Sequence, residues 1–113
     1  MTESLFVEPK ERGSWTVVDV KGEIDLDTAP QLKAVLGDAI KGGAINIAVN
    51  LEGVEFLDSS GLGVLIGSLK RCKEAGGMLA LVSPRRPIRK VLSITGLDKV
   101  IPIHDTVEEA TSA

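Results

Sequence analysis

The spacing of apolar residues along the chain alternates between a strand-like and a helix-like period. Residues 14–24 place β-branched side chains in alternation with polar ones, which is typical of a strand. The segment LFVEP before it can pair with this strand through a turn around Gly13. The further segments predicted as strands are residues 44–51, 78–82 and 100–103.

Between the strands predicted at residues 14–24 and 44–51, apolar residues recur at the spacing of one helix face. Residues 32–40 carry apolar side chains at positions i, i+3, i+4, i+7 and i+8. We expect Asp27 or Thr28 to cap the start of this helix and Gly42–Gly43 to end it. A second helical face begins after Asp58, and the remaining predicted helices are a short one within residues 87–97 and a frayed one within residues 106–113.

Strands that alternate with helices predict an α/β fold, here a mixed β-sheet of four to five strands packed against about four helices. The 113 residues are enough for one compact domain, over residues 1–113, and too few for two. Aromatic residues make up only 3% of the chain, so the core must be built from Val, Ile, Leu and Ala. That composition suits a small α/β layer structure better than a β-sandwich.

Charge and cysteine content argue against several classes of function. The chain has 13 Lys and Arg against 16 Asp and Glu, so no basic excess drives direct nucleic-acid binding. A single cysteine, Cys72, rules out an internal disulfide and a cysteine-based metal cluster, and fits a reducing compartment. No signal-peptide pattern and no apolar run of about 20 residues is visible, so we expect a cytoplasmic protein without membrane association.

The most informative stretch is LDSSGLG, residues 57–63, where an apolar strand ends and a helix begins. This edge of an α/β sheet is where ligands usually bind. The simplest interpretation is structural, because the oxygen of Asp58 or Ser59 can cap the free amides of the first helical turn.

Three catalytic or ligand-binding interpretations of this stretch are weak. A serine hydrolase needs a base beside its nucleophile, whereas the only histidine is His104 and the pattern G-x-S-x-G is absent. The glycine spacing G-x-G-x-x-x-G fits no nucleotide-binding fingerprint. Asp25, Asp27 and Asp58 could approach a hard cation only if their loop bends, so we expect neither a metal nor a cofactor.

A fourth interpretation is a phosphorylation switch. A phosphate on a hydroxyl at a helix N-terminus is favoured by the helix dipole, so the modified protein need not unfold. The same phosphate adds about −1.5 to −2 charges beside Asp58. A partner that docks at this corner would meet charge repulsion and bulk where a small hydroxyl had been.

Four features, taken in their order and spacing, carry a family resemblance: GEIDLDTAPQL (residues 22–32), NLEGVEFLDSSGLGVLIG (residues 50–67), the strand entry at Gly76–Gly77 and LSITGLDKVIPI (residues 92–103). Over nearly its whole length the chain resembles bacterial anti-sigma factor antagonists, which are single STAS domains. The resemblance implies that Ser59 is the phosphorylated serine. It also implies that the corner that binds the partner comprises Asp25, Asp58, Ser60, Gly61 and Leu62.

The function implied by this resemblance is partner switching in the control of transcription. The unphosphorylated antagonist would bind an anti-sigma factor, a serine kinase with a histidine-kinase-like ATPase fold, and thereby free the sigma factor. Phosphorylation of Ser59 would break the complex, and a PP2C-type phosphatase would restore it. Ser59 needs no base of its own, because the kinase supplies the catalytic groups. We therefore expect a binding module without catalytic residues of its own and not an enzyme.

Two alternatives remain open from the sequence. One is a domain that binds or weakly hydrolyses a nucleotide at the same helix N-terminus. The other is a scaffold module that binds a partner without being phosphorylated.

Overall fold

Five strands form one sheet in the spatial order β1-β2-β3-β4-β5. The computed structural model describes residues 5–112. The elements in chain order are β1 (Phe6–Arg12), β2 (Trp15–Ile24), α1 (Ala29–Lys41), β3 (Asn46–Leu57), α2 (Ser59–Glu74), β4 (Met78–Val82), α3 (Arg86–Ile94), the 3₁₀ helix η1 (Leu97–Lys99), β5 (Ile103–His104) and α4 (Val107–Thr111).

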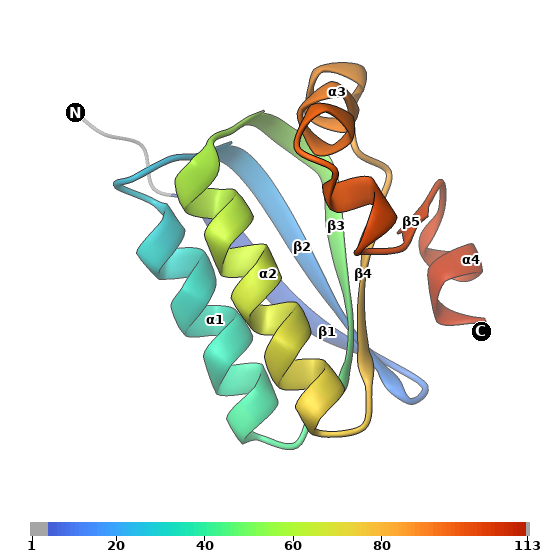
Figure 1. The fold of residues 1–113 in the computed structure, drawn as a ribbon. Coiled ribbons are helices and arrows are strands. Elements are labelled where there is room, and N and C mark those ends of the chain that lie inside the picture. The colour runs from blue at the N-terminus through green and yellow to red at the C-terminus, as the bar shows by residue number, and fades with distance from the viewer. Residues whose placement is uncertain (1–4, 113) are drawn as a thin grey trace.

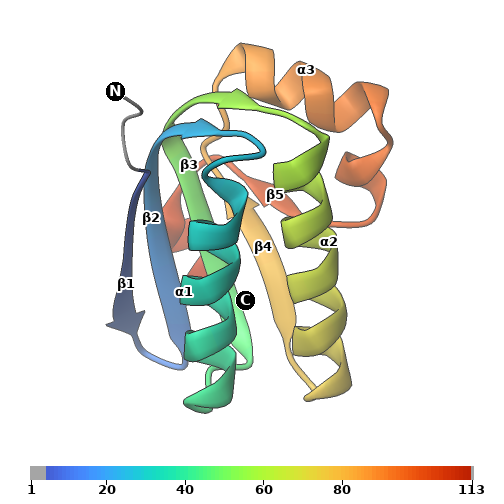
Figure 2. The same ribbon diagram turned by 90° about the vertical axis from the view of Figure 1, so that its left-hand side faces the viewer.

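The first strand pair is an antiparallel hairpin, and every later neighbour in the sheet is parallel. Each parallel connection carries a helix, because a parallel crossover must return the chain along the sheet. Helices α1 and α2 lie side by side across one face of the sheet, while α3 sits beyond the end of β3 (Figures 1 and 2). The predicted α/β class with a mixed sheet is therefore confirmed.

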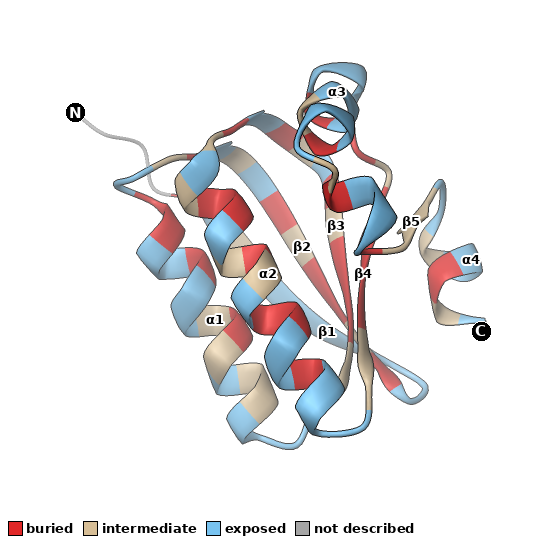
Figure 3. Ribbon diagram, viewed as in Figure 1, coloured by how far each residue is buried: buried red, intermediate tan, exposed pale blue. Residues whose placement is uncertain are grey.

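The main core lies between the sheet and the pair α1–α2. The apolar stripe predicted for the first helix faces the strands, with Leu32 and Leu36 fully buried. Figure 3 shows buried residues on the inner sides of both helices and along the central strands. The strand side chains of this core include Val18, Ile24, Ile47, Val49, Leu79 and Leu81.

A second, smaller core covers part of the opposite face. Trp15, Val17 and Ala48 pack there with Val82 and with Ala110 of α4. The rest of that face is polar: the carboxylate of Asp19 accepts a hydrogen bond from Asn50 Nδ2 at 3.0 Å and lies 3.2 Å from Lys10 Nζ.

Two predicted strand boundaries are wrong. The strand predicted at residues 44–51 continues to Leu57, because the chain stays paired with β2 beyond Gly53, with two shifts of register. The strand predicted at residues 100–103 is displaced to Ile103–His104. The amides of Val100 and Ile101 bond to the carbonyl of Leu97 and continue the turn of η1, so they are not free for the sheet.

Candidate functional site

Two aspartates follow neighbouring parallel strands at the same edge of the sheet. Ile24 at the end of β2 pairs with Leu57 at the end of β3. The amide of Asp58 donates to the carbonyl oxygen of Ile24 at 3.1 Å and ties the two strand ends together. Asp25 and Asp58, which are distant in the chain, thus come to one corner at the ends of these two strands.

The turn that leads into α1 is built around Asp25 and Thr28. One carboxylate oxygen of Asp25 accepts from the amides of Asp27 at 2.9 Å and of Thr28 at 3.1 Å. The buried hydroxyl of Thr28 accepts from the Asp25 amide at 2.9 Å and donates to the Glu23 carbonyl at 2.7 Å. Of the two predicted caps, Asp27 and Thr28, Thr28 is the N-cap residue of α1. Its side chain bonds to no helical amide and stabilises the turn instead. Asp25 therefore has a structural role besides its predicted role in binding.

Asp58, and not Ser59, supplies the side-chain cap of α2. Its backbone is extended and its carboxylate accepts from the Ser60 amide at 2.8 Å. Ser59 is the first residue of the helix and is exposed. Within residues 5–112 its hydroxyl has no hydrogen-bond partner, and the carboxylate of the preceding residue, Asp58, already accepts from the Ser60 amide.

The next two predicted binding residues point inward. Gly61 is buried, and a Cβ on it would lie 2.5 Å from Ile24 Cγ2 and closer still to Leu57 Cδ1. Leu62 is 8% exposed and belongs to the main core. The start of α2 is thus seated tightly on the strand ends. The roles of Gly61 and Leu62 in contacting a partner remain predictions.

Two exposed apolar side chains near the corner were not among the predicted site residues. Leu26 follows Asp25 and is 76% exposed, and Phe56 lies two residues before Asp58 and is 46% exposed. Large apolar side chains that stay exposed in this way often mark interaction sites. The sequence signal was available: Leu26 stands between two aspartates, outside any periodic pattern.

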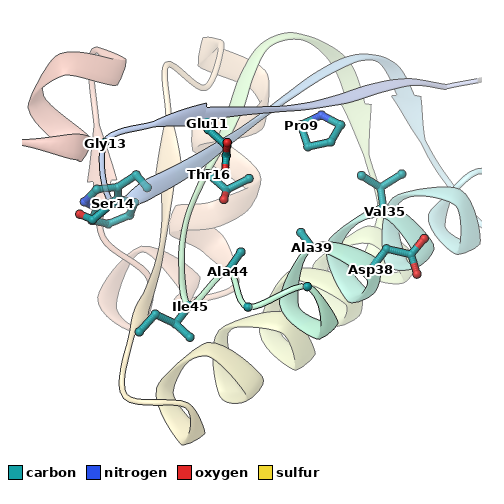
Figure 4. Close-up of a pocket in the computed structure, with 13 residues that line it drawn as sticks. Pro9, Glu11, Gly13, Ser14, Thr16, Val35, Asp38, Ala39, Ala44 and Ile45 are labelled. Atoms are coloured by element: carbon teal, nitrogen blue, oxygen red, sulfur yellow. The ribbon is translucent and has the colours of Figure 1, made fainter.

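A separate hollow lies at the C-terminal end of α1, away from Ser59. It has a volume of about 610 Å³ between the β1–β2 hairpin and the end of α1, and Pro9, Val35, Ala39 and Ile45 supply apolar walls (Figure 4). None of the predicted site residues lines it. In the part of the chain that the structure describes, no three His, Cys, Asp or Glu side chains gather to hold a metal ion, and no helix could cross a membrane.

The α/β architecture, with an exposed serine at the strand-to-helix corner, defines a class of small domain that known proteins share. The STAS domain family matches residues 6–110, and the chain belongs to that family. A curated relative, the anti-sigma-B factor antagonist of Staphylococcus aureus, is 32% identical over 105 residues, which cover 93% of this chain and 97% of the relative.

Solved structures agree with this assignment. An anti-sigma factor antagonist from Mycobacterium paratuberculosis matches with a TM-score of 0.87 at 32% identity, covering 96% of this chain and 92% of that one. The anti-sigma factor antagonist SpoIIAA in its unphosphorylated form matches with a TM-score of 0.79 at 30% identity, covering 95% of this chain and 92% of that one. The phosphorylated form of Bacillus SpoIIAA matches with a TM-score of 0.73, also at 30% identity, covering 96% of this chain and 97% of that one.

Proposed function

We propose that this chain is an anti-sigma factor antagonist that works by partner switching in the cytoplasm. With Ser59 unmodified it binds an anti-sigma factor that is also a serine kinase of the histidine-kinase-like ATPase fold, and a sigma factor is released. Phosphate on Ser59 ends the complex, and a PP2C-type phosphatase returns the chain to its binding form. The domain is a substrate and binding module and brings no catalytic group of its own.

The observation that carries this proposal is the exposed hydroxyl of Ser59 at the first position of α2, which has no hydrogen-bond partner among residues 5–112. A kinase can reach it without unfolding the domain, because the cap of the helix comes from Asp58. The family adds support, since SpoIIAA has been solved both with and without phosphate. A phosphate at this helix terminus interacts favourably with the helix dipole, so the modified domain keeps its fold.

The electrostatics of the corner give a reason for release of the partner. Phosphorylation adds about −1.5 to −2 charges to a site that already holds the carboxylates of Asp25 and Asp58. A partner surface that is complementary to a hydroxyl flanked by two carboxylates meets a different charge and a larger group. Leu26 and Phe56 offer apolar contact area beside the charged centre, an arrangement common in protein interfaces.

The test uses purified protein, serine kinases of this fold encoded in the same genome, and Mg-ATP. We expect phosphate on Ser59 by mass spectrometry, none in Ser59→Ala, and unchanged labelling of the control Ser14→Ala, which removes an exposed serine in the β1–β2 turn, away from the corner. In a pull-down, Ser59→Ala should bind the kinase as the wild type does, and Ser59→Asp should bind at least tenfold more weakly. Phosphate on another residue, absence of phosphate with every kinase, or full binding by Ser59→Asp would refute the proposal.

A further inference from the structure

A groove of about 300 Å³ runs between α1 and α2 and ends near the Ser59 corner. Its lining consists of Lys33, Ser60, Gly63, Val64, Gly67, Ser68 and Arg71. Two of these residues are basic and two carry hydroxyls, but none is acidic. The lining of the groove is therefore positively charged, although the chain as a whole has a net charge of −3.

The two cations have no counter-ion among the residues that the structure describes. Lys33 on α1 and Arg71 on α2 are both exposed, and the ion pairs found within residues 5–112 involve only Lys10 and Arg89. Arg71 lies against the neighbouring helix: its Nη1 is 3.3 Å from where a Cβ of Gly37 would stand. A glycine at position 37 thus lets the guanidinium lie close to α1, on the same groove as Lys33.

The hydroxyl of Ser68, a largely buried residue, provides a second, independent indication of a ligand. Ser68 is only 6% exposed, and within the described residues its hydroxyl has no hydrogen-bond partner. Every fully enclosed polar side-chain atom described there does have a partner, so the Ser68 hydroxyl is open to the groove that it lines. A buried polar group left without a protein partner ordinarily bonds to water or to a ligand.

The floor of the groove lets a ligand approach the helix backbone closely. Positions 63 and 67 are glycines on the groove side of α2, and a Cβ at either would meet no atom within 4 Å. A guanidinium fork, an ammonium group and a serine hydroxyl around an open floor suit a small tetrahedral oxyanion, because several oxygens can accept hydrogen bonds at once.

We infer that the α1–α2 groove is a binding site for a phosphate group, either inorganic phosphate or the phosphate of a small ester. Lys33 and Arg71 supply the charge, and Ser68 donates a hydrogen bond from below. The site is separate from Ser59 and requires neither a kinase nor a phosphorylated form of the protein. It goes beyond the proposed function, and either proposal can fail without the other.

The test is an NMR titration of the ¹⁵N-labelled full chain at pH 7 and constant ionic strength. Inorganic phosphate should shift the amides around residues 33, 60, 63, 67, 68 and 71 in a saturable way, with a dissociation constant on the order of millimolar, as a few charge-assisted hydrogen bonds allow. Acetate should bind at least tenfold more weakly. A titration with AMP distinguishes the two sources of the phosphate group. If AMP binds more tightly than inorganic phosphate, the ligand is a phosphate ester, and if the two bind equally, it is the free anion.

Variants locate the site. Lys33→Gln and Arg71→Gln should each weaken phosphate binding roughly tenfold, and Ser68→Ala severalfold. Lys73→Gln, a matched charge deletion outside the groove lining, and Ser59→Ala should bind as the wild type does. Melting curves verify that each variant is folded. Linear, unsaturable shifts, equal binding of acetate, or wild-type affinity in Arg71→Gln would overturn the inference.

Discussion

Gly61 sets how closely α2 can approach the strand ends that carry the site, and replacing it with alanine tests this reading of the corner. A Cβ at position 61 would lie 2.5 Å from Ile24 Cγ2 and closer to Leu57 Cδ1. Both neighbours are core residues, 0% and 4% exposed, and cannot move into solvent. The added methyl group must therefore displace the helix or the strands.

Two opposing contributions set the expected change in the unfolding free energy of Gly61→Ala. Overpacking of a filled core costs about 1–3 kcal/mol, whereas alanine stabilises a helix by about 1 kcal/mol relative to glycine. Gly63→Ala isolates the second term, because its Cβ would meet no atom within 4 Å in the same helix. We expect Gly63→Ala to raise the unfolding free energy by about 0.5–1 kcal/mol, and the two variants to differ by about 1–3 kcal/mol.

Urea denaturation at 25 °C measures this difference, and thermal unfolding should show the two melting temperatures about 4–12 °C apart for a domain of this size. The slope of the unfolding free energy against urea should match between the variants, since both expose the same surface on unfolding. Equal stability of the two variants, or a Gly61→Ala protein more stable than the wild type, would refute the reasoning that α2 is seated directly on Ile24 and Leu57.

Three further predictions concern the corner and the core. Asp58→Ala should lower the unfolding free energy by about 1 kcal/mol through loss of the helix cap, while Asp58→Asn, which keeps an acceptor, should lose only a few tenths in the same urea assay. Asp25→Ala should lower the unfolding free energy by about 1–3 kcal/mol, because two backbone amides lose their acceptor. Asp25→Asn should keep the stability and weaken only kinase binding. Equal melting temperatures of the Asp25→Ala and Asp25→Asn proteins would contradict this. Burial raises the pKa of the Cys72 thiol above its ordinary 9.0, so the folded protein keeps a proton that the unfolded chain releases. The stability advantage of the wild type over Cys72→Ala should therefore shrink as the pH rises above 9, and a constant difference between pH 7 and pH 10 would contradict it.

Local patterns in the sequence located most of the elements but not all of their ends. The helical spacing of residues 32–40 and the strand-like run at residues 78–82 agree with α1 and β4. In both segments the order of apolar and polar residues follows directly from which side chains are buried. The end of β3 was placed too early, since a glycine at position 53 can mark either a turn or a bulge. Only pairing with β2 decides between them.

The sequence likewise predicts part of the candidate site, and the structure decides the rest. Strand-to-helix position, free amides and an acidic neighbour single out Ser59 from the sequence, since each is a property of the few residues around it. Which oxygen caps the helix was open between Asp58 and Ser59, because both can reach the first-turn amides; the extended backbone at Asp58 settles it.

The sequence by itself determined the alternation of elements and the serine at the head of a helix, because both depend on spacing within one segment. The tertiary structure alone decided what comes from distant segments. It joins Asp25 to Asp58 through the pairing of β2 with β3, seats Gly61 on the strand ends, and sets Lys33 across a groove from Arg71. These contacts depend on how helices and strands pack against one another, and no local period encodes that.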